Sequence, residues 1–324
     1  MKLIISLDVE EEGLFSGRYP RESGVTNVAE LSRLEFIPRD FGLPLTLQVS
    51  YRVARDPAAC KILARWRDQY QAEIGVHLHP WSTPPFADLP HPEPIPAVKI
   101  PLPLLRDKFA HLIEQVQNSL RITPESFRMG RFDFGPRVQG LLPEFGLKVD
   151  SSIVPLTLKG TGDYFLAPAD PFCLIPATPG HPALLEAPLT IVPVAAALPQ
   201  VLARLAPRLP GAAGRRLLGW FKYVGAAGIQ PAWFPLPSMR LAASLHRRRG
   251  GRVFTMFFHS SELQPGASRL FPTELAVRGF VAKIRAFLDW LVKTGPVTGV
   301  TLSGLYQDWL ETQEAFDASA GCSE

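Results

Sequence analysis

With 324 residues, 46% of them hydrophobic, the chain can bury a large core in one α/β domain or in two smaller ones, and its 33 prolines and 25 glycines indicate structured turns rather than disorder. The three cysteines lie far apart, which argues against a disulfide framework and fits reduced thiols in the cytoplasm. The formal net charge is only +4, no apolar run reaches the roughly 18 residues that cross a bilayer, and the acidic N-terminus does not match a signal peptide.

The first part of the chain alternates between apolar strands and helices. Residues 2–7 predict a strand that ends directly at Asp8, and Glu10 lies on the same face if the strand continues. Carboxylates at the carboxyl end of a buried strand are typical of α/β active sites, whereas we interpret Glu11 and Glu12 as solvated loop residues. Helix, strand, helix and strand follow at residues 27–37 (ending before Pro38), 43–49, 56–70 and 73–79. This order favours a parallel sheet with right-handed crossovers.

Two histidines close the last of these strands. His77 and His79 are spaced i, i+2, so they share one face of an extended chain, and Pro80 and Trp81 end the strand. Two adjacent imidazoles suit a divalent metal that accepts nitrogen ligands, zinc first. The alternative is a pair of strand-end histidines that only form hydrogen bonds.

A proline-rich segment follows at residues 81–103, where eight prolines in 23 residues prevent a helix or a central strand. We expect an ordered loop that borders the substrate cleft. Beyond it, a short strand carries Arg128 and leads to Arg131, and arginines at a strand end can orient a carboxylate or bind an anionic group, or simply reach solvent. Another short strand ends at Asp150. Helices are expected before these two strands, at residues 102–120 and 136–145.

The second half of the chain contains a basic block. No aspartate or glutamate occurs between Glu186 and Glu262, a stretch with ten lysines and arginines, while the rest of the chain has 24 basic and 30 acidic residues. Such a block indicates an anionic partner. We interpret residues 195–237 as a basic helical insertion, whose composition fits peripheral contact with an anionic membrane through residues 200–250. A helix with a solvated basic face is the alternative, and no nucleic acid is expected because no reader motif is present.

The last part of the chain returns to the strand and helix pattern. A strongly apolar strand at residues 252–258 ends at His259, and a long helix, a last strand and a closing helix follow at residues 273–293, 297–301 and 303–312. We therefore predict one domain over residues 1–314 and a frayed tail over residues 315–324.

Side chains suited to catalysis thus stand at the ends of several short apolar strands, and in a parallel barrel these ends converge on one face. With these residues the chain resembles the polysaccharide deacetylase family (NodB homology, carbohydrate esterase family 4), and it looks closest to a branch associated with lipopolysaccharide and surface-glycan biosynthesis. The segments that carry the resemblance are LDVEEE at 7–12, EIGVHLHPWSTPPF at 73–86, FRMGRFDFGP at 127–136, VDSSIVP at 149–155 and FFHSSELQPG at 257–266.

The resemblance implies an α/β fold, a distorted (β/α)₇ barrel with proline-rich loops and the basic insertion. It also implies a divalent metal, usually Zn²⁺, and it assigns the catalytic base to Asp8, the base-orienting arginine to Arg128 and the general acid to His259. His77 corresponds to the first metal histidine. We assign substrate binding to three further residues, Trp81, Arg131 and Asp150.

Two departures from the family pattern leave the metal ligands open. The family has two adjacent aspartates, but here Val9 follows Asp8, so either Glu10 supplies the metal carboxylate or Asp8 serves the metal itself. The family spaces its histidines i, i+4, and because Trp81 occupies that position here, His79 must replace the second ligand.

These residues predict a cytoplasmic hydrolase, soluble or peripheral at the inner membrane surface, that removes N-acetyl groups from a sugar of a surface polysaccharide, a lipopolysaccharide or a precursor. The glycan substrate is free or lipid-linked. Two alternatives stay open. One is a hydrolase of another non-peptide carbon–nitrogen bond on the same barrel, and the other is a non-catalytic protein that binds a glycan or a membrane.

Overall fold

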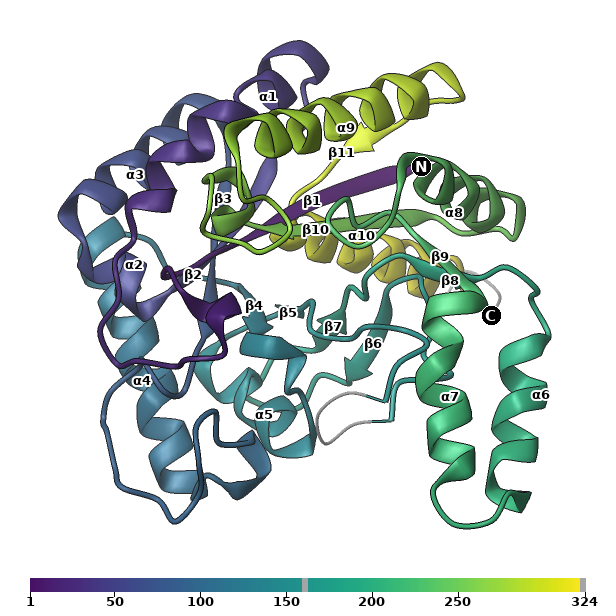
Figure 1. The fold of residues 1–324 in the computed structure, drawn as a ribbon, viewed down its shortest axis with the longest axis horizontal. Helices are drawn as coiled ribbons and strands as arrows, with labels where there is room; N and C mark the ends of the chain where they lie inside the picture. Colours follow the sequence, from purple (N-terminus) through teal and green to yellow (C-terminus); the bar gives the residue numbers. More distant parts are fainter. Residues whose placement is uncertain (159–162, 321–324) are drawn as a thin grey trace.

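A curved, mostly parallel β-sheet forms the centre of the molecule, and helices cover its outer side (Figure 1). The structure is a computed structural model that describes residues 1–158 and 163–320. The strands of the described part are β1 (Lys2–Val9), β2 (Leu45–Ser50), β3 (Glu73–Leu78), β4 (Ser126–Met129), β5 (Val149–Asp150), β6 (Phe172–Ile175), β7 (Leu184–Glu186), β8 (Ile191–Pro193), β9 (Ala226–Gly228), β10 (Val253–His259) and β11 (Thr298–Gly299).

The strands follow the order β10-β1-β2-β3-β4-β5-β7-β6, and β11 pairs with β1. Every pairing between β10 and β7 along this path is parallel, and only the terminal strand β6 runs antiparallel to its neighbour. β1, β2 and β10 are buried almost throughout, so their sequences read as continuous apolar runs. The predicted distorted (β/α) barrel is confirmed as a curled, half-barrel parallel sheet.

Thr190 links the segment that follows β7 to β10, a strand at the other end of the sheet order. Its backbone N–H donates to Thr255 O of β10 at 3.1 Å, and its hydroxyl accepts from Thr255 N at 2.8 Å. The chain reaches this position because β7 ends at Glu186, two residues before Pro188, which cannot donate to the strand ladder. β7 is therefore only three residues long.

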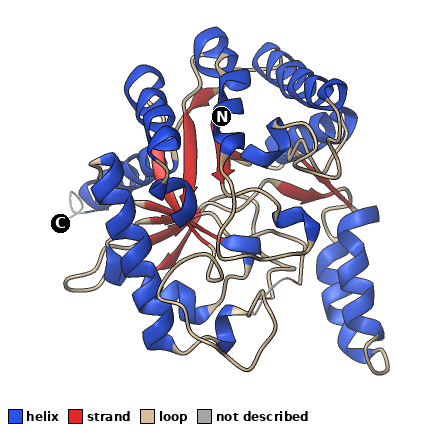
Figure 2. Cartoon of the chain, turned by 60° about the vertical axis from the view of Figure 1, so that its left-hand side comes forward, coloured by secondary structure: helices blue, strands red, loops and turns tan. Residues whose placement is uncertain are grey.

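The α-helices are α1 (Phe36–Phe41), α2 (Tyr51–Arg55), α3 (Pro57–Tyr70), α4 (Leu102–Leu120), α5 (Pro136–Leu141), α6 (Leu198–Leu205), α7 (Ala213–Val224), α8 (Leu236–Arg248), α9 (Glu274–Lys293) and α10 (Leu302–Ala320). Most of the α-helices lie against the outer side of the sheet, whereas α6 and α7 project away from it (Figure 2). Asp56 and Thr273 cap α3 and α9, because each side chain accepts a backbone N–H from the first turn.

Prolines explain most differences between the predicted and observed helices. Pro38 does not stop a helix but lies in the first turn of α1, where its missing N–H is harmless, and a 3₁₀ helix (Thr26–Leu34) precedes it. Pro143 ends α5 early and starts a separate 3₁₀ turn (Pro143–Phe145). α10 continues to Ala320, beyond the predicted boundary at residue 314, and residues 321–324 lie outside the described part.

The basic insertion forms a helical hairpin that projects from the body of the molecule (Figure 1). It consists of α6, a 3₁₀ turn (Ala206–Arg208) and α7, and the antiparallel pair β8 and β9 lies at its base. In the described residues, no helix is both long and apolar enough to cross a bilayer.

Candidate active site

The carboxyl ends of β1, β3, β4 and β10 bring the predicted polar side chains to one place. The parallel register sets Asp8 opposite His259 and His77 opposite Arg128. Of these four residues only His259 is more than 2% exposed, so the sheet holds a charged cluster in a low-dielectric interior. Buried charged groups are stable only when they form ion pairs or hydrogen bonds with one another.

Asp8 and Arg128 form the first buried pair. Arg128 Nη1 donates to Asp8 Oδ1 at 2.9 Å, and the other donors of the guanidinium go to the Ser6 and Ser151 hydroxyls and to Ser151 O at 2.7–2.8 Å. The ring of Phe257 lies beneath it, 4.8 Å from Cζ to the ring centroid. The geometry of this arginine is therefore fixed from all sides, and it orients Asp8.

His77 in β3 and His79 directly after it both point Nε2 at the carboxylate of Glu10. His77 Nδ1 donates to Arg128 O and His79 Nδ1 donates to Glu11 Oε1, each at 3.0 Å. These hydrogen bonds leave the Nε2 lone pair of each neutral imidazole available, which is how metal-ligating histidines are held. His77 Nε2 is buried, and no described residue forms a well-formed hydrogen bond with it.

The spacing of the donor atoms fits a small divalent cation. Glu10 Oε2 lies 3.4 Å from His77 Nε2 and 3.3 Å from His79 Nε2, and Asp8 Oδ2 lies 3.6 Å from His77 Nε2. Ligand atoms about 2.0–2.2 Å from a tetrahedral Zn²⁺ are roughly 3.3–3.6 Å apart, so these donors could hold such an ion. A second group of donors with similar spacing consists of Asp8, Glu10 and His259.

The electrostatics of the cluster also suit a cation. Burial opposes the charge of Glu10, but His259, His77 and His79 nevertheless hold its pKa well below the usual range. In the same way burial opposes the charge of His79, yet Glu11 and Glu10 raise its pKa to about 10. The two carboxylates thus stabilise positive charge at His79 Nε2, the atom that would contact a metal.

Glu11 is not a solvated loop residue, so that prediction is wrong. It is 1% exposed and accepts hydrogen bonds from His79 Nδ1, from the Ser82 hydroxyl at 2.6 Å and from the Ser50 hydroxyl at 2.8 Å. Burial opposes its charge, but His79 and Ser82 lower the pKa of Glu11 to about 2. The error arose because the chain leaves the strand alternation after Val9, so the sequence period no longer indicates which side chain points inward.

His259 faces the cluster from β10, the strand that pairs with β1. Its Nδ1 donates to Glu262 Oε1 at 3.0 Å, while Oε2 of the same carboxylate accepts the His259 backbone N–H at 3.0 Å. Burial opposes the charged imidazole, but Glu262, Glu10 and Asp8 raise the pKa of His259 to about 9. Sequence reasoning missed Glu262, although its position three residues after a strand-end histidine is a capping-box signal.

A cavity of about 780 Å³ opens over these side chains. The predicted proline-rich wall is confirmed, since Pro94, Ile95 and Pro96 line it together with Val98 and Lys99. The volume lies in the range of ordinary ligand sites. The cavity is therefore large enough for a sugar above the charged cluster.

Buried Lys108 secures the start of this wall. Its ammonium donates to the carbonyl oxygens of Pro80, Thr83 and Pro85 at 2.6–2.8 Å, and it is only 4% exposed. The loop after the histidine strand is thus held by a side chain of α4.

The three residues predicted to bind substrate differ in position. Trp81 lines the cavity but stacks on His79, with ring centroids 4.3 Å apart, so it also fixes that imidazole. Arg131 lines the rim, where it donates to the Tyr19 hydroxyl at 2.9 Å.

Asp150 does not line this cavity: it is fully buried, and its carboxylate accepts from the backbone and hydroxyl of Ser152. Asp150 is therefore a structural carboxylate, and we do not retain it as a substrate ligand.

Gly130 allows the loop after β4 to approach the histidines. A Cβ at this position would lie 2.3 Å from His79 Cδ2 and 2.6 Å from Leu78 O, so no larger residue fits without displacing them. The glycine at position 130 thus has a packing role beside the site.

The fold of the chain matches solved structures along nearly its whole length. A Mycobacterium smegmatis protein assigned as a polysaccharide deacetylase has a TM-score of 0.56 at 18% identity, over 96% of this chain and 91% of that one. A Pseudomonas aeruginosa protein with the same assignment has a TM-score of 0.57 at 14% identity, over 95% and 90%. The fold is that of the polysaccharide deacetylases.

A third structure with this deacetylase fold comes from Parabacteroides distasonis and is described as a glycoside hydrolase/deacetylase. It has a TM-score of 0.60 at 11% identity and covers 96% of this chain and 70% of that one. In sequence, the chain matches no protein-family model and no curated protein. At these identities the likeness establishes the deacetylase fold, and the activity must be argued from the site.

Proposed function

We propose that the protein is a metal-dependent hydrolase that removes the N-acetyl group from a sugar of a surface polysaccharide, a lipopolysaccharide or one of their precursors. The observation that carries the proposal is the spacing of Glu10 Oε2 from the two histidine Nε2 atoms, 3.4 and 3.3 Å, beside the separate Asp8–Arg128 pair. It supports Glu10, His77 and His79 as metal ligands and leaves Asp8 for catalysis.

The proposed chemistry divides the hydrolysis between the two sides of the cluster. A divalent cation at Glu10, His77 and His79, most simply Zn²⁺, would acidify a water molecule and polarise the acetyl carbonyl. Asp8 accepts the proton of the attacking water, and Arg128 holds this carboxylate in one orientation.

His259 completes the reaction from the opposite side. The carbon–nitrogen bond breaks as His259 Nε2 donates a proton to the sugar nitrogen, so that water and the amide become acetate and an amine. Glu262 holds the Nδ1 side of the ring, which directs Nε2 towards the cavity. Trp81 and Arg131 line this cavity and are proposed to contact the sugar.

Acetate release tests the proposal directly. Purified protein loaded with Zn²⁺ is incubated with N-acetylglucosamine oligomers and with N-acetylated lipopolysaccharide precursors, and acetate is measured for the wild type, Asp8→Asn and His259→Ala. We expect release by the wild type and a loss of about 10²-fold or more in each variant. Glu114→Gln, on the exposed side of α4, is the matched control.

Three results would contradict the proposal in different ways. Bound metal without acetate from any N-acetylated saccharide, but with hydrolysis of small amides, would favour another carbon–nitrogen substrate. Metal binding without hydrolysis of either class, or no metal retention by the folded protein, would favour a non-catalytic binding protein.

A further inference from the structure

The projecting hairpin of α6 and α7 carries only positive charge. Its basic residues are Arg204, Arg208, Arg215, Arg216 and Lys222, and the surrounding stretch between Glu186 and Glu262 has no acid. Within residues 1–158 and 163–320, none of the five forms an ion pair with a carboxylate. Their charges are therefore available to an anionic partner.

Exposed apolar side chains gather on the same hairpin. Of the eighteen large hydrophobic residues that are exposed in the described part, nine lie between Val194 and Val224. Trp220, Tyr223 and Val224 are 68%, 72% and 81% exposed. Leu217, Trp220 and Val224 are spaced i, i+3, i+7, so they follow one side of α7. An apolar stripe of this kind in water is unusual unless it meets another surface.

The opposite side of the hairpin is already used for packing. Leu218 and Phe221 of α7 belong to a buried cluster with Phe165 and Phe257, and the Phe165 and Phe221 rings lie 5.6 Å apart between centroids. The body of the protein therefore anchors the hairpin through this side, and the exposed stripe remains outside the core.

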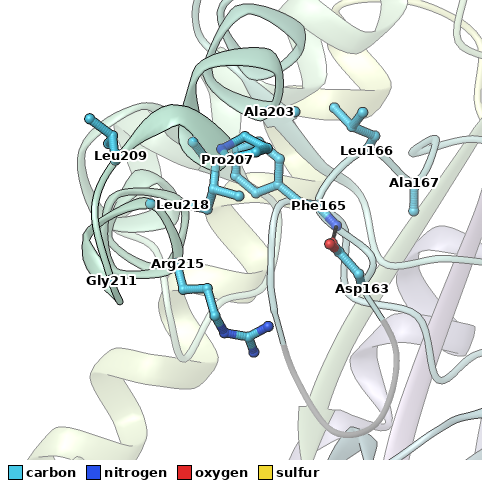
Figure 3. Close-up of a pocket in the computed structure, with 12 residues that line it drawn as sticks. Asp163, Phe165, Leu166, Ala167, Ala203, Pro207, Leu209, Gly211, Arg215 and Leu218 are labelled. Carbon is cyan, nitrogen blue, oxygen red and sulfur yellow. Dashed lines mark hydrogen bonds between the residues drawn. The ribbon is translucent and has the colours of Figure 1, made fainter.

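A second hollow adds apolar surface beside these residues. A cavity of about 600 Å³ lies between the hairpin and the segment Asp163–Ala167, lined by Phe165, Leu166, Pro207 and Leu218, and Figure 3 shows Arg215 at its edge. Apolar lining next to an arginine matches the two parts of a lipid, its acyl chain and its phosphate.

We propose that the α6–α7 hairpin docks the protein on the surface of an anionic lipid bilayer. Trp220 and Tyr223 lie at the level of the headgroups, where amphipathic rings are favoured, and the five basic side chains contact lipid phosphates. A bilayer fits better than a protein partner because charge of a single sign and interleaved aromatic residues are what an anionic interface selects. The proposal does not depend on the deacetylase activity.

Vesicle binding tests this proposal without any substrate. The full chain is mixed with phosphatidylcholine vesicles that contain 30% phosphatidylglycerol or none, and the bound fraction is measured by co-sedimentation. We expect binding to the anionic vesicles only, and its loss in 1 M salt. Arg215→Gln/Arg216→Gln/Lys222→Gln should weaken binding roughly 10²-fold, since each basic residue near the surface contributes about a fivefold factor. Trp220→Ala/Tyr223→Ala should also weaken it.

Matched variants elsewhere on the surface serve as controls. Lys61→Gln/Arg269→Gln/Lys293→Gln removes the same charge, and Leu270→Ala/Leu275→Ala removes exposed apolar side chains, both outside the hairpin. Equal losses in control and hairpin variants would overturn the proposal. So would equal binding to neutral vesicles, no vesicle binding by folded wild type, or hairpin-dependent self-association in place of vesicle binding.

Discussion

The Nδ1 atom of His79 donates to Oε1 of Glu11 across 3.0 Å, and both groups are buried. The hydrogen bond fixes which nitrogen of His79 faces the cluster. A carboxylate behind a ligating histidine also raises the basicity of the ring, so Glu11 should act on the metal without touching it.

Glu11→Gln should therefore weaken metal binding. An amide can still accept from Nδ1–H, but it removes the negative charge behind the ring, and we expect a loss of about 10- to 100-fold in Zn²⁺ affinity. Competition with a chromogenic chelator measures it. Glu12→Gln is the control, because Glu12 binds Thr26 and Asn27 instead of a histidine. An unchanged affinity in Glu11→Gln would show that Glu11 has no role at the metal.

Arg128→Lys should impair turnover more than substrate binding. Lysine keeps the charge but loses the planar fork that contacts Asp8, Ser6 and Ser151 together, so Asp8 is no longer held in one orientation. We expect kcat to fall about 10²-fold with little change in KM, as measured by acetate release. Metal content should stay at the wild-type level, and Arg131→Lys at the cavity rim should affect kcat less. Equal effects of the two variants would argue against an orienting role for Arg128.

Glu262→Gln should shift the pH profile. The Glu262 carboxylate contributes to raising the pKa of His259 to about 9, which keeps the imidazole protonated, and therefore able to act as an acid, up to that pH. Without this charge the pKa falls, so the high-pH limb of kcat/KM should move to lower pH. Initial rates between pH 6 and pH 10 measure the shift. If His259 is not the acid, the limb will stay in place.

Glu186→Gln should stabilise the protein at alkaline pH. Burial, and then the neighbouring Asp150, raise the pKa of Glu186 well above its ordinary value. A raised folded-state pKa favours the protonated form, so stability is highest below the ordinary carboxyl pKa and is lost as the pH rises through the folded value. The neutral amide avoids this loss.

Thermal unfolding at pH 4.5 and pH 8.5 measures the effect. We expect the Tm of Glu186→Gln to exceed that of the wild type by about 2 °C or more at pH 8.5, with a smaller difference at pH 4.5. The exposed control Glu114→Gln should show no such trend. A variant that is less stable than the wild type at both pH values would mean that the hydrogen bond from Ile153 N needs a carboxylate.

Much of the fold was predictable because hydrophobic period and strand ends are local signals. The parallel strands, α3, α4 and α9 appear close to the predicted ranges, and the side chains at Asp8, His77 and His259 meet as strand ends in a parallel sheet must. The short strands β6, β8 and β9 could not be predicted. Each is only three or four residues long, and pairing between distant segments, not local sequence, specifies it.

The supporting residues of the site were harder to predict than its reactive ones. Glu11 and Glu262 lie on irregular backbone just after β1 and β10, so no strand period marks their side chains as buried. Lys108 does lie on the buried side of α4, but the carbonyl groups that it contacts are remote in sequence. Asp150 illustrates the opposite error. It follows a short apolar run as Asp8 does, but its carboxylate accepts from Ser152 and does not line the cavity.

The pairing of Asp8 with His259 across β1 and β10 constrains which changes of length the chain can accept. Because successive side chains of a strand alternate between faces, deleting one residue within β10 would turn His259 away from Asp8 and move the apolar side chains of β10 to the opposite, already packed face. Insertions and deletions in this strand are therefore tolerable only in steps of two, whereas the loops that line the cavity have no such rule. Related chains should thus differ freely in their loops while conserving the parity of spacing between β10 and its histidine.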